Sequence, residues 1–257
     1  MFHQLRSRMV GQAGSTNLED QADQKKFDCP RCKDKEGYLV SGDDGYEYWR
    51  YCECRERRKI ERLFKSSHIT PAFQKLGFKN FRLDGMPQPI VDAYNCAVTY
   101  YRNFQDNRES RHNSIALLGE PGAGKTHLLM AVSNCLISQG VGVTYFPWVE
   151  GFNELKDNLD HLDDRIQKLQ NAPVLFIDDL YKGRAKPTEF QLEQLFAIVN
   201  FRYLNNLPLL VSSEREVDEL CKIDKAIGSR IYEMARDYTV ILNGMELNYR
   251  IHGGATG

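Results

Sequence analysis

A glycine-rich loop is the feature of this chain that most restricts its fold. Residues 119–126 read GEPGAGKT, which fits the phosphate-binding pattern GxxxxGK[ST] without deviation. The apolar run SIALL before it predicts a strand, and THLLMAVSNCLIS after it predicts a helix that ends near Gly140. A strand, a loop and a helix in this order bind nucleotide phosphates, because backbone N–H groups and the helix N-terminus both face the anion.

The residues of this loop have distinct tasks. The glycines let the backbone approach phosphate oxygens, Lys125 supplies a positive charge for the β- and γ-phosphates, and the Thr126 hydroxyl is a ligand for Mg²⁺. The alternative, a chance glycine-rich turn, does not explain why strand, loop and helix are in register. We therefore predict a nucleotide-binding set: Gly119, Glu120, Pro121, Gly122, Ala123, Gly124, Lys125, Thr126 and His127.

A second run, VLFIDD at residues 174–179, supplies acids at the end of an apolar strand. Ligands of open α/β sheets bind at the carboxyl ends of the strands, so these acids are expected near the phosphates. Asp178 is the predicted Mg²⁺ ligand, and Asp179 is predicted to orient and polarise the attacking water. An Asp pair after a strand is otherwise common in turns and helix caps, so the interpretation depends on the phosphate loop.

Short apolar runs alternate with amphipathic stretches from about residue 91 onward. The runs at 114–119, 141–147, 173–178, 208–213 and 238–243 predict five strands, and stretches such as 126–138 and 188–204 predict helices. Such alternation is typical of βαβ units, which place helices on both faces of a parallel sheet. The expected fold is α/β with a five-stranded parallel sheet.

Four of the seven cysteines lie close together in the sequence, as Cys29-x₂-Cys32 and Cys52-x-Cys54. Four thiolates satisfy tetrahedral Zn²⁺, and a metal can supply the folding energy that a segment of this size lacks. A redox pair and unligated thiols are the alternatives, but no βαβ pattern surrounds the first pair. We predict a zinc site at these four residues and treat the other three cysteines as small core residues.

Charge and hydropathy exclude several classes of protein. Lys and Arg number 34 against 35 Asp and Glu, so overall basicity gives no argument for nucleic acid. The stretch from Arg50 to Lys65 is locally basic, and Tyr46, Tyr48, Trp49 and Tyr51 beside it either stack on single-stranded bases or flank a solvated helix. No apolar run is long enough to span a membrane, and no signal peptide is recognisable, which predicts a cytoplasmic protein without membrane partners.

These observations predict an order of parts along the chain. Residues 1–26 form a flexible tail, 27–66 a zinc-binding domain, 67–90 an irregular linker that packs its phenylalanines, 91–252 the α/β core and 253–257 a short tail.

The ordered set of motifs resembles the AAA+ ATPases, and more narrowly the helicase loaders of the DnaC/DnaI type with their phage and prophage relatives. It comprises ITPAFQKLGFKNF, GEPGAGKTHLLMAVSN, VLFIDDL, LPLLVSSE, IGSRIYE and LNYR, and covers about residues 29–252. The resemblance implies that the bound nucleotide is ATP. It places a sensor of the γ-phosphate at Ser213 or Glu214, where many members have Asn, and an arginine finger for a neighbouring subunit at Arg230.

The same resemblance implies a function and partners. The chain is expected to load a replicative hexameric helicase onto single-stranded DNA, with ATP hydrolysis as a timer and with self-association through the ATP sites. The zinc domain would grip the helicase, and Lys182, Arg184 and Lys186 are candidate DNA contacts. Only residues 244–257 follow the last strand, too few for the helical lid of many AAA+ proteins. Arg250 is a further candidate for touching nucleotide.

Two other functions fit the same motifs. One is a transposition helper ATPase of the IstB-like type, which shares the lidless core but is not expected to carry a zinc domain. The other is an ATP-switched adaptor that binds ATP and hydrolyses little of it.

Overall fold

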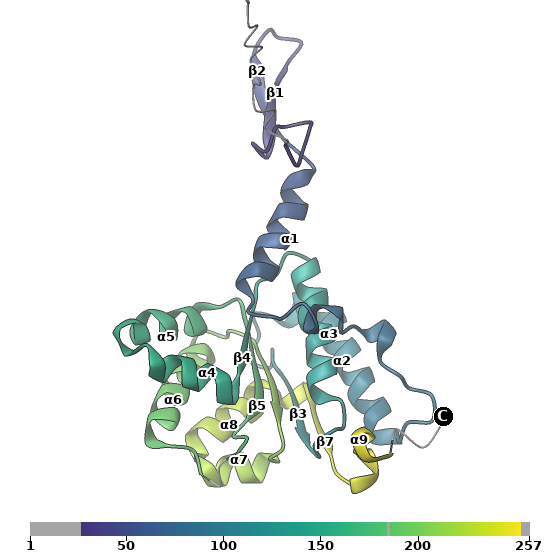
Figure 1. Ribbon diagram of the computed structural model, residues 1–257, viewed down its shortest axis with the longest axis vertical. Helices are drawn as coiled ribbons and strands as arrows, with labels where there is room; N and C mark the ends of the chain where they lie inside the picture. Colours follow the sequence, from purple (N-terminus) through teal and green to yellow (C-terminus); the bar gives the residue numbers. More distant parts are fainter. Residues whose placement is uncertain (1–26, 184–185, 253–257) are drawn as a thin grey trace, which may run out of the picture. The chain divides into compact units, whose positions relative to one another are not determined.

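The computed structural model describes residues 27–183 and 186–252. The predicted tails 1–26 and 253–257 and the candidate Arg184 lie outside these ranges. The chain divides into two compact units, one up to Arg55 and the other from Glu56 (Figure 1). This division falls within the first turns of helix α1 (Cys54–Ser66), inside the segment predicted as the zinc domain.

The first unit is a hairpin beside the cysteines. Strands β1 (Gly37–Ser41) and β2 (Glu47–Tyr51) pair antiparallel, with Leu39 opposite Trp49. The Asp44 carboxylate accepts hydrogen bonds from the Tyr46 amide and the Tyr48 hydroxyl, which closes the turn. A two-stranded hairpin is marginal in water by itself, so this unit needs a further source of stability.

The second unit contains the predicted sheet. All five strands are parallel, in the spatial order β4-β5-β6-β3-β7. Their bounds are β3 (Ile115–Gly119), β4 (Val143–Pro147), β5 (Val174–Leu180), β6 (Leu209–Ser213) and β7 (Thr239–Leu242). The five-stranded parallel sheet expected from the sequence is confirmed, and each strand falls at its predicted apolar run.

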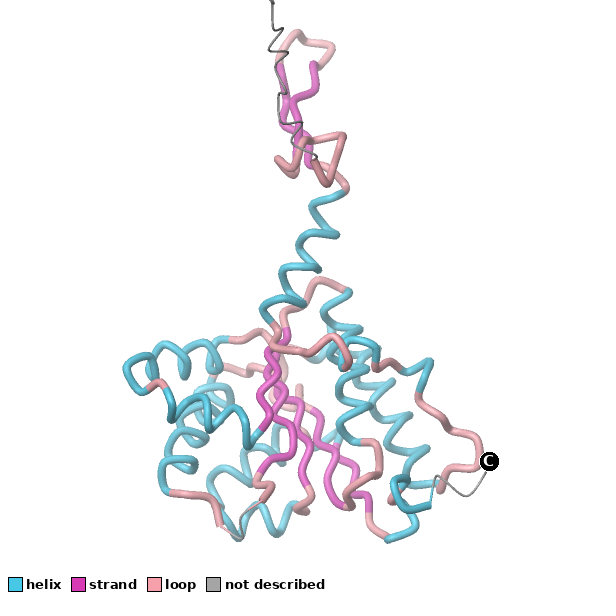
Figure 2. Tube along the Cα trace, in the orientation of Figure 1, coloured by secondary structure: helices cyan, strands magenta, loops and turns pink. Residues whose placement is uncertain are grey.

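Helices cover both faces of this sheet (Figures 1 and 2). Side chains alternate along each strand, so Ile115 and Leu117 pack on one face while Ala116 and Leu118 pack on the other. The first face carries α2 (Gln88–Asn107) and α3 (Lys125–Ser138). The second carries α4 (Trp148–Asp157), α5 (Leu162–Asn171), α6 (Glu189–Leu204), α7 (Val217–Ile223) and α8 (Lys225–Met234).

The predicted linker is an ordered strap across α3. It contains two short 3₁₀ turns, η1 (Phe73–Lys75) and η2 (Phe78–Asn80). As predicted, Phe73, Phe78 and Phe81 pack against the core. The Asn134 amide on α3 donates to the carbonyls of Phe73 and Leu76, which pins the strap beside the phosphate loop.

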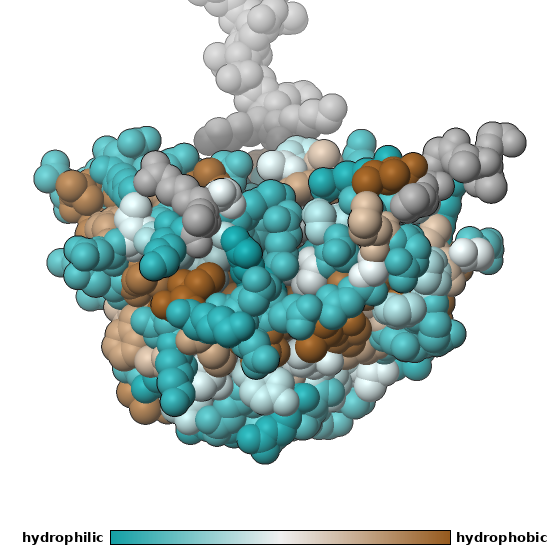
Figure 3. Space-filling view, turned by 90° about the horizontal axis from the view of Figure 1, so that it is seen from below, coloured by the Kyte–Doolittle hydropathy of each residue, from teal (hydrophilic) through white to brown (hydrophobic). Residues whose placement is uncertain are grey.

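The end of the described chain returns to the phosphate loop. After β7 follow η5 (Met245–Leu247) and α9 (Tyr249–His252). The Tyr249 amide donates to the Gly122 carbonyl at 3.2 Å, so this segment lies directly on the loop. Seen from below, where α9 lies in Figure 1, hydrophobic residues form separate patches on a mostly hydrophilic surface (Figure 3).

Arg202 is a structural cation in the second unit. Its side chain on α6 is fully buried, and its guanidinium donates to the carbonyls of Leu169, Gln170, Ala172 and Pro208. Leu169 and Gln170 lie in the last turn of α5, Ala172 follows that helix, and Pro208 directly precedes β6, so one side chain ties together the segments that lead into β5 and β6. Within the described residues, no helix is long and apolar enough to cross a membrane.

Candidate functional site

The phosphate loop lies where the predicted pattern requires, between the end of β3 and the start of α3. Gly119, Gly122 and Gly124 all have positive φ angles, +107°, +77° and +82°, which side chains rarely allow. At Gly119 a Cβ atom would also stand 2.2 Å from the Leu242 carbonyl oxygen of β7. The glycines thus serve both the left-handed turns and a close approach of two backbones.

Lys125 is a buried cation, and none of the described carboxylates lies within ion-pair distance of it. Its ammonium donates to the carbonyls of Gly119 at 2.7 Å and Glu120 at 2.6 Å. Burial lowers the pKa of Lys125 to about 8, against the opposing effect of the Asp179 and Glu214 charges. A buried ammonium that contacts only carbonyls lacks a counter-charge in direct contact, and the phosphates of a nucleotide would supply one. This residue therefore fits an anion.

Asp178 is held by three hydroxyl groups. Thr126 Oγ1 donates to Oδ1 at 2.9 Å, Tyr145 Oη donates to Oδ2 at 2.9 Å, and Ser212 Oγ donates to Oδ1. Burial raises the pKa of Asp178, while the hydroxyl donors oppose this shift by stabilising the carboxylate. The sequence predicted that Thr126 and Asp178 both serve Mg²⁺; it predicted no contact between them and gave no role to Tyr145 or Ser212.

Asp179 stands on an irregular end of β5. The register of β5 on β6 shifts between Ile177 and Leu180, and Asp179 itself has a positive φ of +55°. Such a conformation costs about 1–3 kcal/mol for a residue with a side chain. The Asp179 amide donates to Ser212 Oγ at 2.7 Å, so Ser212 contacts both acids. Asp179 Oδ2 accepts from Lys182 Nζ at 2.6 Å.

These groups border one cavity of about 920 Å³. It is lined by Lys125, Thr126, Asp178 and Asp179 together with other parts of the chain. The further lining includes Pro121, Gly122, Gly124, His127, Tyr145, Lys182, Glu214, Tyr249 and Arg250. The volume suits a nucleotide. Gly119 and Glu120 act through the carbonyls that hold Lys125, rather than by lining the cavity.

A smaller hollow of about 270 Å³ adjoins the loop. It shares Gly122, Gly124 and His127 with the larger cavity and also contains Ala123. Phe81, Met86 and Ile90, from the strap and the start of α2, make it largely apolar. The sequence assigned none of these three residues to the site; of the three, only Phe81 was expected to pack at all.

Ser213 and Glu214 differ in where they point. Ser213 is fully buried, and its hydroxyl donates to the Leu180 carbonyl at 2.7 Å and accepts from the Arg215 amide at 3.0 Å. Glu214 lines the nucleotide cavity and lies 3.6 Å from Lys182 Nζ. Ser213, predicted among the catalytic residues, therefore has its hydroxyl committed to backbone, and Glu214 is the residue of this pair at the cavity.

Arg230 lies on α8 and does not line the nucleotide cavity of its own chain. Its Nη1 donates to the Ala226 carbonyl at 2.9 Å, and its guanidinium rests near the rings of Phe196 and Tyr203 at 5.5 and 5.3 Å. Attraction between a guanidinium and aromatic rings at such distances helps to hold the side chain in place. The structure thus keeps Arg230 apart from Lys125 and Asp179.

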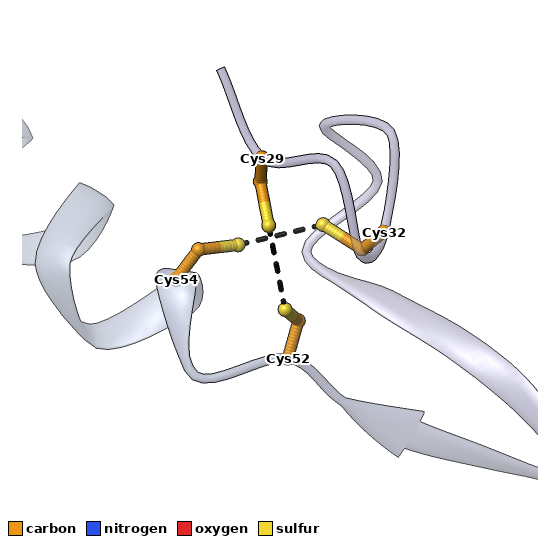
Figure 4. Close-up of side chains that lie close together, drawn as sticks. All are labelled: Cys29, Cys32, Cys52 and Cys54. Carbon is orange, nitrogen blue, oxygen red and sulfur yellow. Dashed lines mark hydrogen bonds between the residues drawn. The ribbon is translucent and has the colours of Figure 1, made fainter. Parts of the chain in front are cut away.

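The four predicted zinc ligands come together (Figure 4). Their sulfur atoms all lie within 4.8 Å of one another, with 3.7 Å between Cys29 and Cys52 and 3.4 Å between Cys32 and Cys54. Four sulfurs around a tetrahedral Zn²⁺ with bonds of about 2.3 Å stand about 3.8 Å apart. The Cys32 amide lowers the pKa of Cys29 to about 6, which favours the thiolate that a metal needs, whereas burial raises the pKa of Cys54. Donor set and spacing both fit zinc.

Comparison with known proteins places the second unit in a family. The pattern of the bacterial DnaA ATPase domain matches residues 89–235. The chain belongs to this family. Phage-like element PBSX protein XkdC of Bacillus subtilis strain 168 is 48% identical over 239 residues, which covers 91% of this chain and 90% of XkdC. The resemblance to phage-type AAA+ proteins of the DnaC/DnaI group is confirmed.

Two more distant similarities involve replication proteins. Replicative helicase loader DnaC of Escherichia coli K12 is 26% identical over 208 residues, or 77% of this chain and 80% of DnaC. A structure of the replication initiator DnaA bound to AMPPCP and single-stranded DNA has a TM-score of 0.55 at 21% identity, covering 69% of this chain and 51% of that one. Together with the family, these comparisons support a replication-related AAA+ protein that binds ATP.

Proposed function

We propose that this protein is an ATP-dependent loader of the replicative DNA helicase onto single-stranded DNA. One observation carries the proposal: the chain combines a complete nucleotide site with a separate four-cysteine unit. In the nucleotide site, Thr126 Oγ1 lies 2.9 Å from Asp178 Oδ1. The first part matches a family of replication ATPases, and the second is suited to holding a partner protein. An IstB-like transposition helper is not expected to carry the second part.

The residues of the cavity divide the work of ATP hydrolysis. Lys125 would exchange its two carbonyl partners for phosphate oxygens, and Phe81, Met86 and Ile90 would pack against the nucleobase. Thr126 and Asp178 would hold Mg²⁺, which supplies charge neutralisation on the phosphates when bound. Asp179 would orient the attacking water, and Glu214 would take the sensor position that the resemblance assigned to Ser213 or Glu214.

The charges of the cysteine unit favour a protein partner over nucleic acid. Between residues 27 and 55, acidic residues outnumber basic ones, and a zinc tetrathiolate would add negative charge. The basic residues are Arg31, Lys33, Lys35, Arg50 and Arg55; the acidic ones are Asp28, Asp34, Glu36, Asp43, Asp44, Glu47 and Glu53. Leu39, Trp49 and Tyr51 share one face of the hairpin and are exposed. An apolar face on an acidic unit suits protein contact better than a phosphate backbone.

Catalysis by this site is expected to depend on assembly. Arg230 stands outside its own cavity and is held ready by aromatic neighbours, so it would complete the site of an adjacent copy. ATPase activity should then rise more steeply than linearly with protein concentration, or require a partner. Strictly linear activity down to nanomolar protein would contradict this part of the proposal.

The ion pair between Lys182 and Asp179 favours a second candidate, the ATP-switched adaptor that hydrolyses little ATP. Turnover by the wild type and by Asp179→Asn separates the two functions, because a pure switch loses little activity. The loader proposal itself is tested by a pull-down with the replicative helicase of the host in ATP and in ADP. Nucleotide-dependent capture that is lost on removal of residues 1–55 is the expected result. Absence of capture in either nucleotide would refute the loader function.

A further inference from the structure

Two acids at the end of β5 stand opposite a single residue of β6. Asp178 and Asp179 together face only Ser212, which makes this irregularity a β-bulge; the regular pairs on its two sides are Ile177 with Val211 and Leu180 with Ser213. Bulges are rare between parallel strands and are over-represented next to active sites. In the register of β5 with β4 and β6, all of them described, Asp179 has no partner residue. Its amide therefore needs an acceptor outside the regular ladder.

The Ser212 hydroxyl supplies that acceptor and contacts the neighbouring acid as well. Its oxygen accepts from the Asp179 amide at 2.7 Å, and its proton is donated to Asp178 Oδ1. A hydroxyl donates one hydrogen bond and accepts others, so one side chain joins the backbone of one acid to the carboxylate of the other. Because Ser212 is fully buried, bulk water does not compete for these two bonds.

Asp179 has a backbone conformation that depends on such bonds. Its φ of +55° lies in the left-handed region, which is costly for a residue with a side chain and persists only where the surroundings hold it. The Asp179 amide donates to Ser212, and the Asp179 carbonyl accepts from the Lys182 amide at 2.9 Å. The bond to Lys182 is local to the turn, so it is the bond to Ser212 that ties this residue to the sheet.

We propose that Ser212 is a positioning residue for ATP hydrolysis: it holds the bulge, and the bulge aims the Asp179 carboxylate into the nucleotide cavity. Successive side chains of a regular strand point to opposite faces, yet Asp178 and Asp179 both line this cavity. Without the bulge, residue 179 would point to the face on which Ile177 packs. This inference rests on the proposed function, in which Asp179 orients the attacking water.

The conformation of residue 179 can be tested without hydrolysis. Glycine tolerates a positive φ and alanine does not, whereas alanine is the more stable of the two in a regular strand. Asp179→Gly should therefore unfold at a higher urea concentration than Asp179→Ala while Ser212 is present. In a Ser212→Ala background the strand can return to regular pairing, and the order of the two urea midpoints should reverse. The same order in both backgrounds would overturn the proposal.

Turnover shows whether this geometry serves the reaction. At saturating Mg²⁺, Ser212→Ala should lower kcat for ATP hydrolysis by about tenfold or more, because a small misplacement of a catalytic group is costly. The KM for ATP should change by less than about twofold, since the phosphate loop and Lys125 are left intact. Saturating Mg²⁺ is needed because the same substitution removes a hydrogen-bond donor from Asp178.

Ser114 offers a matched control on the same sheet. It is buried, and its hydroxyl likewise accepts from a backbone amide, that of Leu209, and donates to a side-chain oxygen, that of Asn113. Ser114 directly precedes β3, whereas the nucleotide cavity lies at the opposite ends of the strands. Ser114→Ala should lower the urea midpoint as Ser212→Ala does and leave kcat unchanged. Equal losses of kcat in the two variants would overturn the positioning role.

Failure of the proposed function gives a different pattern. Wild-type turnover in Asp179→Asn would refute the role of Asp179 in hydrolysis, and with it the positioning role of Ser212, even if the urea midpoints reverse. Reduced turnover in Asp179→Asn together with unchanged turnover in Ser212→Ala would overturn the positioning role alone. The loader function is tested separately, in the helicase pull-down, which neither experiment uses.

Discussion

Lys125 should make the stability of the nucleotide-free protein depend on pH in a defined direction. Burial lowers its pKa from 10.5 to about 8 in the folded protein. The unfolded chain therefore binds the proton more tightly than the folded chain, and between about pH 8 and 10.5 folding releases a proton. The buried lysine therefore lowers the free energy of unfolding at neutral pH, and this penalty disappears as the pH rises through that window.

The size of the effect follows from the shift. About 2.5 pKa units at about 1.4 kcal/mol each give a penalty of roughly 3 kcal/mol below pH 8. At pH 9.5 the unfolded lysine is still mostly protonated while the folded one is neutral, so about 2 kcal/mol of that penalty has been recovered relative to pH 7.5. Lys125→Met removes the titrating group and keeps most of the buried stem.

Urea unfolding of the wild type and of Lys125→Met at pH 7.5 and 9.5 measures the effect. The difference between the two proteins cancels the titration of all other groups. From pH 7.5 to pH 9.5, the free energy of unfolding of the wild type should rise by about 2 kcal/mol relative to that of Lys125→Met. Saturating ATP should remove the gain, because the phosphates stabilise the charged amine. A difference that is independent of pH would refute the argument that the amine is buried without a counter-charge.

Three further changes test other parts of the structure. Tyr145→Phe removes one hydroxyl donor from buried Asp178 without leaving a cavity, so it should weaken Mg²⁺ binding by about 1.5–3 kcal/mol. ATP hydrolysis should then need at least a tenfold higher Mg²⁺ concentration, while the affinity for ATP changes little. Cys52→Ser should release about one zinc per chain by elemental analysis, whereas Cys135→Ser on α3 should release none; unchanged zinc in Cys52→Ser would disprove the site. Arg202→Met leaves four carbonyls without their donor and should lower the free energy of unfolding by about 3–5 kcal/mol, whereas exposed Arg102→Met should change it by less than about 0.5 kcal/mol.

The parts of the site that sequence predicts are those whose partners lie in the same motif. The phosphate loop is contiguous, so its glycines, Lys125 and Thr126 follow from one pattern. Tyr145 and Ser212 lie 33 and 34 residues from Asp178, on β4 and β6, the two strands that flank β5. Their contacts depend on strand order and register, which no local pattern specifies.

The sequence alone could have shown that Ser213 does not face the same side of the sheet as Ser212. Side chains on a strand alternate between faces, so Ser212 and Ser213 point to opposite faces of the sheet at the end of β6, and Glu214 follows the strand. Ser212 contacts the acids and Glu214 lines the cavity, while Ser213 bonds to backbone on the other side. Once Ser212 is placed beside the acids, the alternation on β6 turns Ser213 away from them. By contrast, the bulge that turns Asp179 toward Lys182 leaves no such signal, because it depends on a register shift between β5 and β6.

The nucleotide site of this protein has a protein partner for each group that would bind Mg²⁺ and ATP. Lys125 contacts two carbonyls, Asp178 accepts from three hydroxyls, and Asp179 is paired with Lys182. Binding must therefore exchange one set of contacts for another, and each exchange displaces a different element. Release of the carbonyls affects β3 and the loop, release of the Thr126 hydroxyl from Asp178 affects the start of α3 and the end of β5, and release of Lys182 affects the turn after β5. Binding of nucleotide and Mg²⁺ therefore changes the contacts of three separate elements of the fold at once.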